Sequence, residues 1–246
     1  MKLYGLIGYP LGHSFSKKYF TNKFKREGLI DYSYELFPIN SIKELPSLIN
    51  SQPYLKGFNV TIPYKQQVLK YVTETSEAVK EIGAANVIKI DGDKIVAFNT
   101  DVIGFKESLI QKLMPFHKKA LILGTGGSSN AVQYVLRNLG MEFLLVSTTH
   151  QPSSEIISYS MINENIMSDH TLIINCTPVG MKPNFSALPN LPYQFISHKH
   201  YLFDLIYNPE KTSFLQKGEQ MGAIIQNGYE MLVLQAEESW NIWKQN

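Results

Sequence analysis

A glycine-rich loop is the feature of this sequence whose residue types and spacing point most directly to chemistry. It comprises Gly124, Thr125, Gly126, Gly127 and Ser128, after the apolar run 120–123 and before a segment of helical periodicity. In a strand–loop–helix unit, such glycines let the backbone turn tightly and approach a pyrophosphate, and the helix N-terminus supplies free N–H groups and a favourable dipole. Ser129, at the third glycine position, is small enough for close packing of helix against strand. We therefore predict dinucleotide binding here, in preference to a plain tight turn.

The residues after the next apolar strand bear on which dinucleotide binds. The run 143–146 is followed by Ser147, Thr148, Thr149 and His150. When NAD is bound, this strand normally ends in Asp or Glu, which holds the ribose 2′-hydroxyl, whereas an Arg accommodates the 2′-phosphate of NADP. Neither is present, and hydroxyls and an imidazole hold a phosphate more weakly than a bidentate Arg does. The missing acid favours NADP over NAD. The alternative is that these residues form an ordinary polar loop.

Short apolar runs alternate with helix-like segments along the chain, which is typical of α/β proteins. Before a polar break at 115–119, we expect strands at 2–8, 32–39, 58–62, 85–90 and 94–98, and helices at 16–28, 42–50, 64–72, 76–82 and 100–114. After the break we expect strands at 120–123, 143–146, 172–175, 201–205 and 223–225, and helices at 128–139 and 229–243.

The connection after residue 146 is unusually short. Only about ten residues separate Ser147 from the next plausible strand near 157–161. A parallel crossover normally needs a dozen or more residues, usually with a helix. We therefore expect this crossover to have lost its helix or reduced it to a turn.

Length and composition exclude several classes of protein. At roughly 100–200 residues per domain, 246 residues allow one large domain or two small ones. A hydrophobic fraction of 44% with 18% charged residues argues against disorder, and a net charge of +2 without a dense basic stripe argues against nucleic acid as a partner. The single cysteine excludes a disulfide framework, and the six histidines form no metal motif. No long apolar span and no signal peptide are evident, so we expect a cytoplasmic protein that does not bind membranes.

Seven strings, taken together and in order, resemble the shikimate dehydrogenase family. They are GYPLGHSFS from Gly8, NVTIPYK from Asn59, GAAN from Gly83, NTD from Asn99, the loop at Gly124, NCTPVGM from Asn175 and NGYEMLVLQA from Asn227. Each string alone is modest support, but together they cover nearly the whole chain.

The resemblance implies a fold and an activity. The expected fold is α/β with two domains: a substrate domain at 1–101 completed by the C-terminal helix at 229–246, and a Rossmann-type dinucleotide-binding domain at 102–228. The implied activity is an NADP-dependent interconversion of 3-dehydroshikimate and shikimate in aromatic amino-acid biosynthesis. The implied partner is this small-molecule substrate, and the chain would be a monomer or a homodimer.

The resemblance places Lys65 and Asp101 at the catalytic position, where a proton moves between the substrate hydroxyl and a protein acid or base. Without the family resemblance, Lys65 would more often be a surface lysine that follows a strand, and Asp101 would more often be an aspartate that stabilises a helix start. Ser14 and Ser16 lie just before a helix, so their hydroxyls and the helix N-terminus suit the substrate carboxylate, although Ser16 could also simply cap that helix.

Further residues match family positions at the substrate and the cofactor. The implied substrate-binding residues are Asn59, Thr61, Asn86, Tyr207 and Gln235. The implied cofactor-binding residues, besides the glycine loop and Ser147, Thr148 and Thr149, are Thr177, Leu205 and Gly228. We expect a structural hydrogen bond for His13, and an inert position in a buried strand for Cys176.

The sequence also departs from the family pattern at four positions. Lys17 stands where proline is usual, and Val102 and Glu230 stand where glycine is usual. Thr148 stands in place of the arginine at the phosphate-binding strand end, which puts the cofactor preference in question.

Two other functions remain open at this stage. A quinate/shikimate dehydrogenase using NAD would be favoured by an acid at Ser147 or Thr148, and none is present. A non-catalytic module on the same fold, responsive to shikimate or a dinucleotide, would be expected to lose Lys65 or Asp101, and both are intact.

Overall fold

The computed structural model describes residues 1–12 and 14–245 and divides into two compact units. The first unit contains Met1–Thr100 and Ala236–Asn246, and the second contains Asp101–Gln235. The two-domain α/β fold expected from the sequence is confirmed. The finer functional limits, at 101/102 and 228/229, stay a prediction.

The first unit is built on a mixed six-stranded sheet in the order β2-β1-β3-β5-β6-β4. Its strands are β1 (Lys2–Gly8), β2 (Tyr32–Pro38), β3 (Leu55–Val60), β4 (Glu74–Thr75), β5 (Val87–Asp91) and β6 (Lys94–Phe98). The central strand β1 pairs in parallel with β2 and β3, while β3, β5 and β6 pair antiparallel. Gly92, with φ +58°, lies in the tight turn between β5 and β6, where glycine adopts this backbone conformation without strain.

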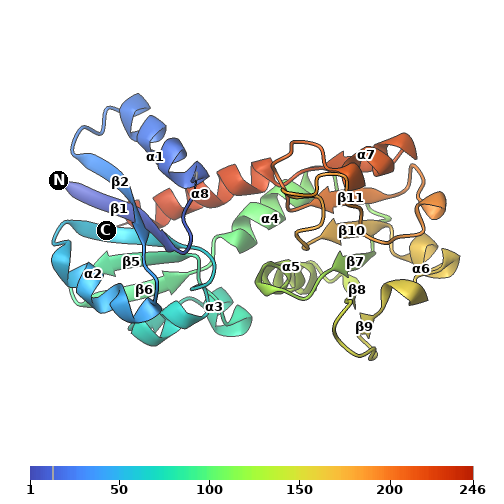
Figure 1. The fold of residues 1–246 in the computed structure, drawn as a ribbon, viewed down its shortest axis with the longest axis horizontal. Helices are drawn as coiled ribbons and strands as arrows, with labels where there is room; N and C mark the ends of the chain where they lie inside the picture. The colour runs from blue at the N-terminus through green and yellow to red at the C-terminus, as the bar shows by residue number, and fades with distance from the viewer. Residues whose placement is uncertain (13, 246) are drawn as a thin grey trace. The chain divides into compact units, whose positions relative to one another are not determined.

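Helices cover both faces of this sheet (Figure 1). They are α1 (Phe15–Arg26), α2 (Leu45–Ser51), α3 (Glu77–Ile82) and the end of α8 (Tyr229–Lys244), with 3₁₀ turns at Ile42–Glu44 and Gln67–Tyr71. On one face, Tyr4 packs against Phe24 of α1 and against Trp240 and Trp243 of α8. On the other face, residues of α2, α3 and the 3₁₀ turns pack around Phe58.

The second unit is a wholly parallel six-stranded sheet in the order β12-β11-β10-β7-β8-β9. Its strands are β7 (Lys119–Leu123), β8 (Glu142–Val146), β9 (Ile156–Ile157), β10 (Leu172–Asn175), β11 (Tyr201–Asp204) and β12 (Ile224–Gln226). The strand order reverses at β7, which is the switch point at which ligands bind in doubly wound sheets.

This sheet is also covered on both faces, as its nearly continuous apolar strands require. Helices α4 (Asp101–Ile110) and α5 (Gly127–Asn138) pack together, and Phe105 of α4 meets Phe203 of β11 edge-to-face at 5.1 Å. The opposite face carries α6 (Glu164–Asp169), α7 (Ser213–Gln220) and the 3₁₀ turns Tyr159–Met161 and Tyr193–Phe195. Figure 1 shows α5 and α6 on opposite sides of β7 and β8.

The crossover from β8 to β9 contains no helix, as its length predicts. Leu145 and Ser147 donate backbone N–H groups to Glu155 and Ile157 at 2.8 and 3.0 Å, so the chain returns directly to the edge of the sheet. The strand expected near 157–161 is only Ile156–Ile157, because the chain then tightens into a 3₁₀ turn.

Several short elements differ from the sequence-based expectation. The helix expected at 64–72 is a 3₁₀ turn at Gln67–Tyr71, and the helix expected to reach residue 114 ends at Ile110. The sequence reading missed α6 and α7, whose N-caps are Asn163 and Thr212. Six- and eight-residue helices present too few apolar repeats for periodicity to register.

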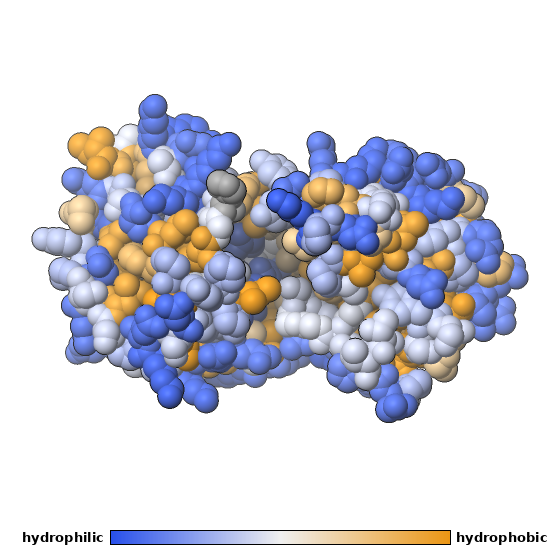
Figure 2. Space-filling view, viewed as in Figure 1, coloured by the Kyte–Doolittle hydropathy of each residue, from blue (hydrophilic) through white to orange (hydrophobic). Residues whose placement is uncertain are grey.

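Hydrophilic side chains cover much of the face in Figure 2, with smaller apolar areas between them. In the part of the chain that the structure describes, no helix combines the length and apolar character needed to cross a membrane.

Candidate functional site

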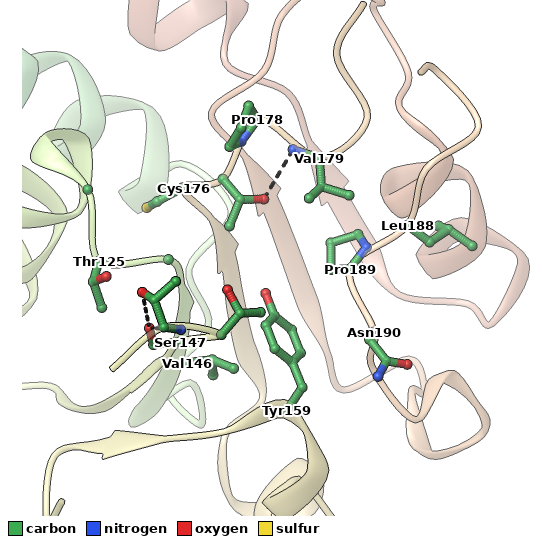
Figure 3. Close-up of a pocket in the computed structure, with 15 residues that line it drawn as sticks. Thr125, Val146, Ser147, Tyr159, Cys176, Pro178, Val179, Leu188, Pro189 and Asn190 are labelled. Atoms are coloured by element: carbon green, nitrogen blue, oxygen red, sulfur yellow. Dashed lines mark hydrogen bonds between the residues drawn. The ribbon is translucent and has the colours of Figure 1, made fainter. Parts of the chain in front are cut away.

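A cavity of about 540 Å³ opens at the carboxyl ends of β7, β8 and β10 in the second unit (Figure 3). Figure 3 shows Thr125 and Ser147 on one side and Val179, Pro189 and Asn190 on the other. The predicted cofactor residues that line it are Gly124, Thr125, Gly126, Ser147, Thr148, Thr149 and Thr177. The structure thus brings together three loops that are separated by 20 to 50 residues of sequence.

The glycine loop has the backbone that a close approach requires. Gly124 adopts φ +100°, and its N–H donates to the Val146 carbonyl at 2.8 Å. A Cβ on Gly126 or Gly127 would have no atom within 4 Å, so the backbone there faces open space. Gly126 is the N-cap of α5 and supplies no side-chain cap, which leaves the first N–H groups of the helix available to an anion. The loop therefore fits the pyrophosphate of a dinucleotide.

The polar strand end beside the loop is free of carboxylates. Among the described residues that line the cavity there is no Asp, Glu, Lys or Arg side chain. Ser147 is 5% exposed, and its hydroxyl accepts the backbone N–H groups of Thr149 and His150 at 3.2 and 3.1 Å. The site thus offers hydroxyl groups and repels no 2′-phosphate, which suits NADP.

A buried hydrogen-bond network holds the floor of the cavity. The Thr177 hydroxyl and N–H donate to Asn175 Oδ1 at 2.6 and 3.0 Å, and Asn175 Nδ2 donates to Asp204 Oδ1 at 3.0 Å. Asp204 is fully buried and accepts from the Thr212 hydroxyl at 2.6 Å and the Ile206 N–H at 3.1 Å. The loops after β10 and β11 are thereby fixed to each other.

Burial raises the pKa of Asp204 to about 6, against the hydrogen bonds from Thr212, Ile206 and Asn175. The folded state therefore binds this proton more tightly than the unfolded state. The contribution of the protonated carboxyl to the free energy of unfolding is fully present below about pH 3.8 and is lost as the pH rises through about 6. The two-unit shift corresponds to about 3 kcal/mol. We expect Asp204→Asn to gain roughly 2–2.5 kcal/mol relative to wild type between about pH 4 and pH 7. Urea unfolding of both proteins at the two pH values tests this, and parallel pH profiles would contradict it.

Four predicted cofactor residues do not line this cavity. Gly127 and Ser128 form the first turn of α5, and the Ser128 side chain is exposed. Leu205 and Gly228 lie against each other, because a Cβ on Gly228 would be 2.1 Å from the Leu205 carbonyl oxygen. Gly228 N–H also donates to the Ile206 carbonyl at 3.0 Å. Their binding roles stay predictions.

In the first unit, Asn59 and Asn86 form one buried polar network. Asn59 accepts from the Tyr34 hydroxyl at 2.7 Å and donates to Ser239 Oγ at 3.1 Å and to the Asn86 carbonyl at 3.3 Å. Asn86 Oδ1 accepts the Thr100 N–H at 2.7 Å, and both asparagines are less than 7% exposed. These amides therefore hold β3, β5 and α8 together in addition to any contact with substrate.

The other predicted substrate residues of this unit lie at strand ends and at a helix start. Ser14, not Ser16, is the N-cap of α1 and accepts the Lys17 N–H at 3.3 Å. The capping alternative for Ser16 is therefore wrong, because α1 begins one residue before it. Thr61 and Lys65 follow β3 and are half-buried. The expectation for His13 lies outside the described residues.

Three further predicted residues belong to the second unit. Asp101 is the first residue of α4 and is half-buried. Tyr207 follows β11 and is 40% exposed, and Gln235, on α8, is 9% exposed and donates to the Leu232 carbonyl at 3.1 Å. Their roles, like those of Lys65 and the serines, stay predictions.

Cys176 differs from its expected place. The strand β10 ends at Asn175, whose side chain accepts the Thr177 N–H, so Cys176 lies just after the strand. There it is half-buried and lines the cavity. Burial and the neighbouring charge of Asp204 raise the pKa of the Cys176 thiol, which keeps it protonated.

Sequence reasoning missed part of the cavity wall and the groups beneath it. Besides Cys176, the missed lining residues are Val146, Tyr159, Pro178, Val179, Leu188, Pro189 and Asn190. Most of them come from irregular segments with no periodic pattern, although Pro178 and Val179 stand inside the NCTPVGM string. Within residues 1–12 and 14–245, no three His, Cys, Asp or Glu side chains gather in a way that could hold a metal ion.

The fold and the cavity define a two-domain α/β protein with a dinucleotide-binding unit. The family described as "Shikimate dehydrogenase substrate binding domain" matches residues 6–88. A curated shikimate dehydrogenase (NADP(+)) of Methanococcus maripaludis is 37% identical, over 98% of this chain and 91% of its own length. This chain belongs to the shikimate dehydrogenase family.

Solved structures agree with this assignment. Shikimate 5-dehydrogenase from Listeria monocytogenes, in complex with shikimate and NAD, superposes with a TM-score of 0.90 at 25% identity, covering 100% of this chain and 92% of that one. The Thermus thermophilus enzyme, in complex with NADP(H) and shikimate, gives 0.86 at 28% identity, covering 99% and 94%.

Proposed function

We propose that this chain is an NADP-dependent shikimate dehydrogenase, which interconverts 3-dehydroshikimate and shikimate in aromatic amino-acid biosynthesis. Two observations together support the proposal. The cavity beside the glycine loop is lined by no carboxylate, and the chain matches a curated NADP-dependent shikimate dehydrogenase over 98% of its length. In this reaction the nicotinamide supplies or receives the hydride.

Lys65 and Asp101 are proposed to move the proton. Lys65 donates a proton to the carbonyl oxygen of 3-dehydroshikimate as that oxygen becomes the hydroxyl of shikimate, and takes it back in the reverse direction. Asp101 orients the ammonium group and accepts a hydrogen bond from a substrate hydroxyl. Neither step requires a metal ion.

The remaining residues bind and orient. Ser14 and Ser16, with the N-terminus of α1, are proposed to hold the substrate carboxylate. Asn59, Thr61, Asn86, Tyr207 and Gln235 are proposed to hold the rest of the substrate. The first N–H groups of α5 and the polar residues after β8 are proposed to hold the pyrophosphate and the 2′-phosphate of NADP.

Initial rates with shikimate and quinate, each against NADP and NAD, test the proposed function. We expect the highest kcat/KM for shikimate with NADP. A higher value for quinate with NAD would favour the quinate/shikimate alternative. Failure to oxidise shikimate with either cofactor would contradict the proposal and favour a non-catalytic module.

Replacing Ser14 and Ser16 together by alanine should raise the KM for shikimate more than it lowers kcat. Each lost hydrogen bond to a charged group costs about 1.5–3 kcal/mol. Because Ser14 also caps α1, some stability is lost as well, about 1 kcal/mol. Ser76→Ala is the matched control, because Ser76 is the N-cap of α3 and accepts the Val79 N–H. Steady-state kinetics should show a changed KM in the double variant alone; an unchanged KM would place the carboxylate elsewhere.

A further inference from the structure

The imidazole of His150 is the centre of a hydroxyl cluster at the end of β8. His150 Nδ1 lies 3.1 Å from the Ser147 hydroxyl, 3.2 Å from the Thr125 hydroxyl and 3.3 Å from the Thr149 hydroxyl. Thr125 comes from the glycine loop after β7, whereas the other three residues follow β8. The histidine therefore joins the two loops on which the adenosine end of a dinucleotide would rest.

The three hydroxyl-bearing residues all line the cavity, and His150 lies directly beside them. The titratable side chains that line the cavity are Tyr159 and Cys176, and burial raises the pKa of both, so they stay neutral near pH 7. Asp204 lies beneath the floor, behind Asn175 and Thr177. His150 is thus the one group among these that can bring positive charge to the hydroxyl cluster.

We propose that His150, when protonated, replaces the missing arginine as the cationic partner of the NADP 2′-phosphate, so that the preference for NADP over NAD increases as the pH falls. This inference rests on the proposed function, and it assigns the cofactor selectivity of this chain to a titratable residue.

The chemistry of the cluster supports a second effect of the proton. An unprotonated Nδ1 accepts a hydrogen bond, which directs a hydroxyl hydrogen toward the ring. In the tautomer that carries its hydrogen on Nε2, Nδ1 accepts from one hydroxyl at a time; once protonated, Nδ1 donates, and that hydroxyl hydrogen becomes available to a phosphate. The proton therefore adds a charge and frees one O–H donor at the same place.

Imidazole side chains ordinarily change charge between about pH 5 and pH 8, and charge-assisted hydrogen bonds are roughly twice as strong as neutral ones. NAD lacks the 2′-phosphate, so its binding should be insensitive to this charge. We expect the ratio of the NAD to the NADP dissociation constant to be on the order of 5–10-fold larger at about pH 5.5 than at about pH 8.

The experiment measures dissociation constants of NADP and NAD by calorimetry, without substrate and without turnover, at about pH 5.5 and about pH 8. Wild type is compared with His150→Gln, which keeps a polar side chain that does not titrate. The 2′-phosphate itself takes up a proton near pH 6, and the glutamine variant contains this contribution unchanged. Titration of Asp204 affects the floor for both cofactors and cancels in the ratio.

We expect the ratio to change with pH in wild type and to stay flat, or to fall at low pH, in His150→Gln. Thr148→Arg supplies a charge that does not titrate, so it should bind NADP more tightly than wild type at about pH 8 and lose most of the pH dependence. A wild-type ratio that does not change with pH, or a glutamine variant that keeps the wild-type pH dependence, would overturn the inference.

These outcomes are separable from failure of the proposed function. A protein that binds NADP and oxidises shikimate, but whose cofactor ratio is independent of pH, contradicts only the role of His150. A protein that binds neither cofactor contradicts both. His150 is exposed, so its replacement should leave the melting temperature unchanged, and a thermal unfolding curve checks this.

Discussion

Replacing Lys65 by alanine should lower kcat by about 10²–10⁴-fold while shikimate continues to bind. This is the range that general acid–base catalysis contributes to a reaction. The proposed role of Lys65 is confined to the step that moves the proton, whereas the carboxylate and hydroxyls of the substrate are assigned to other residues. Its loss should therefore act on kcat far more than on the dissociation constant of shikimate.

The matched control is Lys70→Ala. Lys70 is an exposed lysine of the same unit, in the 3₁₀ turn Gln67–Tyr71, so its loss removes the same charge without touching the proposed site. Single-turnover rates and equilibrium binding of shikimate separate the chemical step from affinity. Asp101→Asn should lower kcat and also weaken shikimate binding, because the aspartate is assigned both tasks. Near-normal turnover of Lys65→Ala at neutral pH would remove Lys65 from the mechanism.

Gly228→Ala should destabilise the protein strongly. A Cβ at this position would lie 2.1 Å from the Leu205 carbonyl oxygen and 2.6 Å from its carbonyl carbon. Both are backbone atoms, so no side-chain rotation relieves the clash, and the end of β11 must move away from the start of α8. That movement also strains the hydrogen bond from Gly228 N–H to the Ile206 carbonyl. We expect a loss of about 3 kcal/mol, which lowers the melting temperature by roughly 6–12 °C.

Gly126→Ala is the control with the opposite expectation. Gly126 has φ −77°, which any residue can adopt, and a Cβ there meets no atom within 4 Å. The variant should keep its melting temperature and bind NADP more weakly, because the methyl group would occupy space beside the proposed pyrophosphate position. Thermal unfolding with and without NADP measures both effects. A stable Gly228→Ala variant would show that β11 and α8 can separate at little cost.

The sequence predicts the strands and the glycine loop of this protein well, because both depend on local patterns. The strand expected at 172–175 coincides with β10, the one expected at 201–205 is β11 with one residue too many, and the loop at Gly124 stands between a strand and a helix as expected. The short β8–β9 crossover also follows from counting residues. Each of these features requires knowledge only of neighbours along the chain.

The cavity wall and the buried networks depend on contacts between distant segments, which no local pattern reveals. From the sequence, Asp204 looks like an ordinary residue at a strand end. In the structure it is fully buried and accepts hydrogen bonds from Asn175 and Thr212. Asn59 and Asn86 match family positions, but local pattern does not reveal their bonds to Ser239 and Thr100, because both partners are distant from the asparagines along the chain. The capping residue of α1 is Ser14 because the helix starts one residue earlier than its apolar spacing indicates.

The return of α8 to the first unit has a consequence for how the chain is made. Trp240 and Trp243 pack against Tyr4, and the Trp243 indole N–H donates to the Ile88 carbonyl at 2.9 Å, so residues after 235 complete a core that begins at the N-terminus. The ribosome makes all 135 residues of the second unit (101–235) before these two tryptophans exist. At about 5–20 residues per second, the aromatic face of the first sheet lacks these two tryptophans for roughly 7–27 s. The unit that is translated first is therefore the last to be finished, and during that interval Tyr4 and Phe24 lack the ring contacts that Trp240 and Trp243 later make.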